Sequence, residues 1–185
     1  MTELFLVMSP GPFTTVQDKG RFGHQHLGIP VSGALDAFAF RTANLLVGNP
    51  RESAVLEMTV VGAKLAVMLE ADVAVTGAPM EMKLNSIPIE SWQSLRVLPG
   101  DILSIQTVKN GCRGYLAVTG GIAVPEVMGS CSTYAGGKMG GHRGRPLRKG
   151  DIIQSGPGDL LHVQRHLPLS MIPQYARDID LRAIP

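Results

Sequence analysis

The stretch VLEMTVVGAKLAVMLEADVAVTGAPMEMKLN, residues 55–85, contains four short apolar runs separated by breaks. Three of them lie at 55–59, 63–69 and 72–76. The fourth, MEMKLN at 80–85, alternates apolar and charged residues, which is typical of a strand with one solvated face. Runs of this length and spacing predict consecutive β-strands.

The same pattern continues on both sides of this stretch. An apolar run in MTELFLVMSPG, at the beginning of the sequence, predicts a first strand. Asn110-Gly111 is a strong hairpin signal between two apolar runs. Short strands at this spacing predict a mainly β fold, either a closed barrel or a sandwich. The further predicted strands are SLRVL (94–98), ILSIQ (102–106) and RGYLAV (113–118), and KGDII (149–153) is expected to make a turn and enter a strand.

One α-helix is expected, at about residues 36–48. Asp36 can cap its N-terminus, and Gly48 followed by Pro50 can end it. Helical spacing predicts one buried face, with Arg41 and Asn44 pointing elsewhere. The residues expected on the buried face are Leu35, Phe38, Ala39, Thr42 and Leu46.

Composition limits the class of protein. The chain has 185 residues, 22 glycines and a net charge of +2, which indicates one turn-rich domain, or one with part of a second, and argues against a nucleic-acid partner. No stretch approaches the roughly 20 apolar residues of a membrane span. Cys112 and Cys131 match no metal or redox spacing. With no export signal recognised, we expect a cytoplasmic protein with reduced thiols and no membrane partner.

A loop rich in glycine and basic residues, AGGKMGGHRGRPLRKGD (135–151), is a candidate anion site. Successive glycines allow backbone N–H groups to converge on an anion, and Arg143 and Arg145 could grip a carboxylate or phosphate. The loop matches neither the P-loop nor the dinucleotide fingerprint. An ordinary mobile surface loop is the alternative.

A second candidate is the polar segment 14–36, which includes Gln17, Asp18 and Arg21. Long loops dense in polar groups are often functional. Alternatively, Asp18 and Arg21 pair across a turn. The segment also contains two histidines, at 24 and 26, but no third ligand is evident, and we predict no metal site.

Two further groups of residues could carry chemistry. Glu57 lies within an apolar run, so its carboxylate is either solvated or buried beside a cation, with Arg113 and Tyr115 as possible partners. It is then a structural ion pair or a catalytic carboxylate. The segment MGSCSTY (128–134) is not a nucleophile elbow. Its hydroxyls are expected to bond to a bound polar ligand.

Several motifs together resemble one known family. They are TTVQDKGRFGHQHLGIPVSGALD, ANLLVGN, AVLEM, VTGA, RGYLAVTGGIAVPEVMGSCSTY and GGHRGRPLRKGD, in this order. Their order and spacing are similar to those of the carboxyltransferase A/B-subdomain family, also called allophanate hydrolase subunit 2, KipA or the 5-oxoprolinase C subunit. The resemblance runs from about residue 4 to residue 156 and implies a cyclophilin-like β-barrel.

Members of that family are longer than this chain. The resemblance therefore implies a first half at 1–158 and a connector at 159–185 that leads to a second half. The tail IDLRAI (179–184) is expected to form an unpaired edge strand, which would favour homo-oligomers.

The resemblance implies a subunit of ATP-dependent 5-oxoprolinase, a hydrolase that opens 5-oxoproline to L-glutamate. Its partners would be two further subunits, one KipI-like and the other LamB/YcsF-like, with ATP and Mg²⁺ in the assembled complex. One alternative is a KipA-like regulator that binds a KipI-type kinase inhibitor. Another is the carboxyltransferase part of a urea carboxylase or allophanate hydrolase system, which would use biotin.

Membership in the family motifs, together with residue type, implies roles for eleven residues. The implied catalytic residues are Asp18, Glu57 and Arg113. The residues implied in substrate or anion binding are Gln17, Arg21, Ser130, Ser132, Thr133, Gly140, Gly141 and Arg145.

Overall fold

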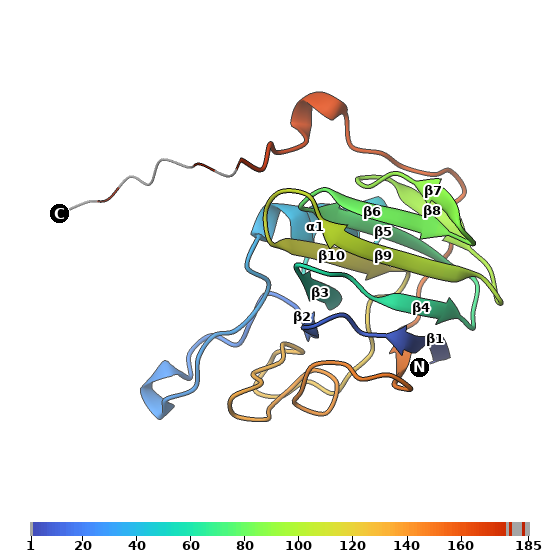
Figure 1. Cartoon of the computed structure of the whole chain (residues 1–185). Helices are drawn as coiled ribbons and strands as arrows, with labels where there is room; N and C mark the ends of the chain where they lie inside the picture. The colour runs from blue at the N-terminus through green and yellow to red at the C-terminus, as the bar shows by residue number, and fades with distance from the viewer. Residues whose placement is uncertain (1, 177, 179–182, 184–185) are drawn as a thin grey trace.

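A computed structural model describes residues 2–176, 178 and 183, and within them the chain folds into two antiparallel β-sheets with one α-helix (Figure 1). In the six-stranded sheet the strands are ordered β11-β1-β4-β9-β6-β7. The order in the five-stranded sheet is β2-β3-β10-β5-β8. The first sheet contains β1 (Thr2–Ser9), β4 (Lys64–Val67), β6 (Met80–Leu84), β7 (Ile87–Ile89), β9 (Ile102–Val108) and β11 (Ile152–Ser155). The second contains β2 (Thr14–Gln17), β3 (Val55–Thr59), β5 (Ala71–Gly77), β8 (Ser94–Val97) and β10 (Arg113–Val118).

The mainly β architecture expected from the sequence is confirmed. The four runs of residues 55–85 form β3, β4, β5 and β6, and the boundaries of β3 match the prediction. Two short strands, β2 and β7, were missed. β2 has only four residues, TTVQ, and three of them are polar, so although it is entirely buried it shows neither an apolar run nor an alternation to detect.

The five-stranded sheet is covered on both faces. A large apolar core lies between the two sheets, and a smaller one lies between this sheet and the helix α1 (Ala37–Leu46). β5 is consequently buried at every position, whereas Glu81 on β6 is exposed between two buried methionines. This difference explains why β5 reads as a continuous apolar run and β6 as an alternating one.

The helix is capped as predicted, but its buried face is different. The Asp36 carboxylate accepts the Ala39 N–H at 2.9 Å. Leu35 is 73% exposed and Phe38 45% exposed, whereas Asn44 is fully buried, so the predicted face was wrong at these positions. The cause is a polar contact: the Asn44 amide donates to the Ser53 carbonyl at 2.8 Å and draws that side of the helix inward. The buried apolar residues of the helix are Ala39, Phe40, Ala43 and Leu46.

The predicted hairpin at Asn110-Gly111 is also wrong. The chain does turn there, and Gly111 has a positive φ of 86°. However, the flanking strands β9 and β10 belong to different sheets and do not pair with each other. Turn residues fix a local reversal of the chain, but the apolar faces of the strands decide the pairing.

The segment after residue 158 is held against the body of the domain. The Leu161 N–H donates to the buried Asp72 carboxylate at 2.6 Å, and the Arg165 N–H donates to the Ser94 hydroxyl at 2.7 Å. A short 3₁₀ helix, η2 (Leu169–Met171), follows. The predicted edge strand IDLRAI lies, apart from one residue, outside the described residues. In the described part of the chain, no helix is long and apolar enough to cross a membrane.

Candidate functional site

Asp18 is the centre of a buried hydrogen-bond network. The network joins the end of β2 to residues 128–134, the serine-rich segment. Its carboxylate accepts the hydroxyl protons of Ser130 at 2.6 Å and Ser132 at 2.5 Å. It also accepts the backbone N–H groups of Cys131 at 2.6 Å and Gly20 at 2.8 Å. All four hydrogen-bond donors to this carboxylate belong to the chain itself.

The network also controls the charge of Asp18. Burial by itself would raise the pKa of this carboxyl, but the hydrogen bonds from Ser130, Ser132 and the backbone N–H groups outweigh it, so the pKa is lowered. Asp18 therefore remains ionised at neutral pH. A permanently ionised carboxylate with four internal donors is suited to holding the segment in place.

The neighbouring predicted residues have internal partners as well. Arg21 is fully buried; its Nε and Nη2 atoms donate to the carbonyls of Val127 and Ser132, whereas its Nη1 atom forms no hydrogen bond within the described residues. The Gln17 amide contacts Thr15 at 2.9 Å. The Thr133 hydroxyl donates to the Val16 carbonyl of β2 at 2.9 Å. The expected pairing of Asp18 with Arg21 is not formed.

Glu57 and Arg113 form an ion pair across adjacent strands. Their closest atoms, Glu57 Oε1 and Arg113 Nε, lie 3.4 Å apart without hydrogen-bond alignment. The second Glu57 oxygen accepts the Leu35 N–H at 2.9 Å. Tyr115 is opposite Glu57 in the sheet, and its pKa is raised by burial and by the Glu57 charge. The structural alternative stated for Glu57 is thus present, whereas its catalytic role stays a prediction.

The loop at residues 135–151, which is rich in glycine and basic residues and is called the glycine loop below, is folded back on itself. The Gly141 N–H donates to the Cys131 carbonyl at 3.0 Å, and the Gly144 N–H donates to the Gly140 carbonyl at 2.7 Å. Arg145 binds the Asp151 carboxylate through two hydrogen bonds of 2.7 and 2.8 Å. An external anion would have to displace Asp151 to reach Arg145. These groups therefore do not form a free cradle for the phosphates of a nucleotide.

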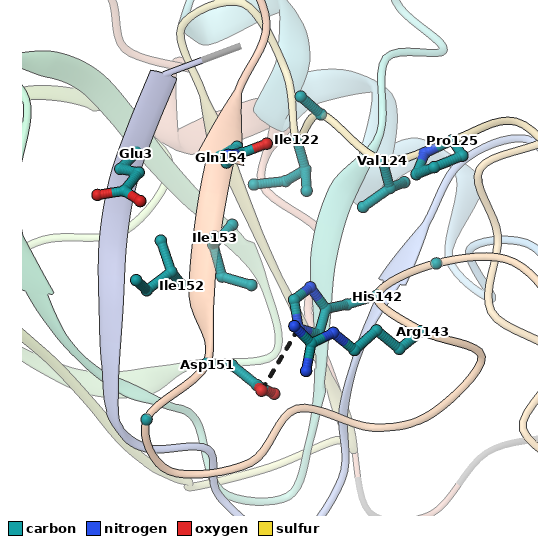
Figure 2. Close-up of a pocket in the computed structure, with 13 residues that line it drawn as sticks. Glu3, Ile122, Val124, Pro125, His142, Arg143, Asp151, Ile152, Ile153 and Gln154 are labelled. Atoms are coloured by element: carbon teal, nitrogen blue, oxygen red, sulfur yellow. Dashed lines mark ion pairs between the residues drawn. The ribbon is translucent and has the colours of Figure 1, made fainter.

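A cavity of about 450 Å³ lies beside this loop, between the outer edge of β11 and residues 122–125 (Figure 2). Its apolar wall is formed by Ile122, Val124 and Pro125. Its polar groups come from Glu3 on β1, Gln154 on β11, and His142, Arg143 and Asp151. None of these five residues was among the predicted site residues, although Arg143 was considered as part of the loop.

His142 lies at the polar end of the cavity. Its Nε2 atom is 3.4 Å from Asp151 Oδ1, but it forms no hydrogen bond within the described residues. Burial lowers the pKa of His142, the charges of Arg145 and Arg143 lower it further, and Asp151 only partly opposes them. The imidazole is therefore neutral at pH 7. Nε2 is itself buried, but a neutral imidazole has one nitrogen that donates a hydrogen bond and one that accepts it, so the ring can still bond to a ligand in the cavity.

Sequence reasoning missed this cavity for a specific reason. Its residues come from the first strand, the last strand and two loops, and no single motif contains them. The available signal was the pair His142-Arg143 after two glycines, where the loop bends. Asp151 was interpreted only as part of a turn that enters a strand.

The cavity and the two-sheet fold define a β domain with a polar site at one edge, and known proteins share this architecture. The urea amidolyase of Kluyveromyces lactis superimposes with a TM-score of 0.88 at 39% identity, covering 96% of this chain and 11% of that chain. The 5-oxoprolinase C subunit of Escherichia coli is 43% identical over 152 residues, covering 81% of this chain and 48% of that protein. Urea amidolyase of Lachancea kluyveri is 46% identical over 150 residues, covering 80% of this chain and 8% of that protein.

The model of the family described as carboxyltransferase domain, subdomain A and B, matches residues 27–185. The chain belongs to this family. It spans about half the length of the 5-oxoprolinase subunits that it matches and a much smaller part of the urea amidolyases.

Proposed function

We propose that this chain forms part of a 5-oxoprolinase, a cytoplasmic hydrolase that opens 5-oxoproline to L-glutamate at the expense of ATP. The supporting observation is its alignment with the C subunit of 5-oxoprolinase, of which it covers about half. In such a subunit this domain would be a principal structural part. In a urea amidolyase it would be one small part among several.

The reaction is the hydrolysis of a cyclic amide, which resonance makes slow. The chain would contribute by binding and orienting the substrate, and its cavity at the edge of β11 is the natural place for this. ATP with Mg²⁺ would activate the amide in the assembled complex. The glycine loop bonds to its own chain, which supports a proposed nucleotide site on the KipI-like and LamB/YcsF-like partner subunits.

The test is glutamate release from 5-oxoproline with Mg-ATP. This chain is mixed with the KipI-like and LamB/YcsF-like subunits of the same genome, and each protein is omitted in turn. We expect release that depends on every component. If a full-length C subunit supports release with these partners and this chain does not, the chain alone is not a sufficient subunit.

A second candidate function is supported by the likeness to urea amidolyase in both sequence and structure. In this alternative the chain is part of a carboxyltransferase that transfers a carboxyl group from biotin to urea. An assay of urea carboxylation, run beside the glutamate-release assay, separates the two functions. Activity that requires urea and a biotinylated carrier, and that avidin abolishes, would contradict the 5-oxoprolinase proposal.

A further inference from the structure

The arginines of the glycine loop differ in what they bind. Arg145 is fully engaged by Asp151. Arg143, two residues earlier, is exposed and lines the cavity, and no carboxylate of the described residues lies within ion-pair distance of it. Arg143 also has a left-handed backbone conformation, with φ 58°. The loop thus presents one unpaired guanidinium at the cavity.

The cavity has two chemically different ends. Figure 2 shows Arg143 and His142 together at one end and Glu3 at the other, with Gln154 close to the Glu3 end. The unpaired cation and the neutral imidazole can bind an anion, because Asp151 beside them is already neutralised by Arg145. The Glu3 carboxylate and the Gln154 amide can accept a hydrogen bond from an N–H donor. The apolar wall of the cavity suits a compact hydrocarbon body.

We infer that this cavity binds a small carboxylate with a compact apolar body and an N–H donor, and that Arg143 holds the carboxylate. His142 lies beside Arg143 and contributes a hydrogen bond. 5-oxoproline has this chemistry: a carboxylate, a five-membered ring and a ring N–H. Its assignment as the ligand rests on the proposed function, whereas the carboxylate site rests on the unpaired guanidinium of Arg143 at the cavity. Urea has no carboxylate and would leave Arg143 unused.

The test measures direct binding to the 185-residue chain. Binding is monitored through the backbone amide NMR signals of a ¹⁵N-labelled sample. The probes are 5-oxoproline and 2-pyrrolidinone, the same ring without the carboxylate. We expect 5-oxoproline to shift the amides of residues 141–143 and 152–154 and to bind at least about tenfold more tightly than 2-pyrrolidinone, since hydrogen bonds to charged groups are strong.

Two variants locate the effect. Arg143→Gln should weaken 5-oxoproline binding by about tenfold or more. Arg148→Gln is the matched control, because Arg148 is an exposed arginine of the same loop that does not line the cavity. It should leave binding unchanged, and thermal unfolding should show both variants to be folded.

Three results would overturn the inference: no shifts at saturating 5-oxoproline, shifts confined to other residues, or equal binding by the Arg143→Gln variant. The proposed function can fail separately. If the complex releases glutamate but the cavity does not bind 5-oxoproline, the proposed function stands and this inference is wrong. If the cavity binds 5-oxoproline through Arg143 but neither this chain nor a full-length C subunit supports glutamate release with the partner subunits, the carboxylate site stands and the proposed function is wrong.

Discussion

Two polar regions of this domain contain similar residue types and differ in what those residues bind. Around Asp18, every carboxylate hydrogen bond comes from the chain itself, and the cluster is buried. At the cavity beside β11, Arg143 has no partner among the described residues and His142 keeps an unused nitrogen. Polar residues that occur together in sequence motifs can therefore serve the fold. Polar groups left without partners are the better guide to a ligand site.

The largest effect is expected where the internal network is broken at its centre. Replacing Asp18 with Ala leaves four buried donors without an acceptor and should lower the free energy of unfolding by about 3–5 kcal/mol. Urea unfolding followed by circular dichroism measures this change. Asp159→Ala, at an exposed carboxylate, is the control and should change stability little. A stable Asp18→Ala variant that has lost activity in the complex would instead support the catalytic role of Asp18.

The next effect comes from the close packing of the glycine loop on the serine-rich segment. A Cβ atom at Gly141 would collide with the Thr133 hydroxyl. Gly23 also has a positive φ, but a Cβ there meets nothing within 4 Å. Both alanine substitutions carry the left-handed cost of about 1–2 kcal/mol, and Gly141→Ala should cost about 1–3 kcal/mol more because of overpacking. Equal stability losses in thermal unfolding would show that the loop is not packed here.

Much of the fold could be predicted from the sequence because its strands are short, apolar and separated by clear turns. Asp36 as a helix cap and Glu57 beside Arg113 are local or adjacent-strand features, and both were anticipated. The buried face of α1 was not anticipated, because Asn44 is drawn inward by polar contacts with residues outside the helix, the Ser53 carbonyl and the Asn49 amide among them.

The candidate site was harder to predict. The partner of Arg145 is six residues away, on the other side of a turn, and residue type alone does not distinguish Arg145 from Arg143. Glu3 and Gln154 reach the cavity only because β1 pairs with β11, at opposite ends of the sequence. Such long-range pairing leaves no local pattern.

A smaller effect, with a characteristic pH dependence, is expected for Arg145→Gln. The hydrogen bonds from Arg145 hold the pKa of Asp151 well below its usual range, despite the opposing effect of burial. A carboxyl with a lowered folded-state pKa stabilises the protein above its unfolded pKa of about 3.9, and this stabilisation is lost as the pH falls through the folded-state value. The variant should lose about 1.5–3 kcal/mol at pH 7.

The loss should become progressively smaller below about pH 4, because Asp151 takes up a proton first in the unfolded chain and only at lower pH in the folded protein. Unfolding by urea at a series of pH values measures it, with Arg148→Gln as the control for removing an arginine from the same loop. A loss that is constant from neutral to acidic pH would mean that the Arg145–Asp151 pair does not contribute through its charge.

The smallest effect on stability is expected for Arg143→Gln. Comparing this variant with Arg145→Gln gives the most direct test of the difference between the cavity and the internal network. Arg143 lies two residues from Arg145 but has no internal partner among the described residues, so its removal should change the free energy of unfolding by no more than about 0.5 kcal/mol. Parallel thermal unfolding of the two variants measures the contrast. A destabilisation as large as that of Arg145→Gln would show that Arg143 belongs to the structural network. A near-neutral result identifies a cation that the fold does not need, and such a cation is free to bind a ligand.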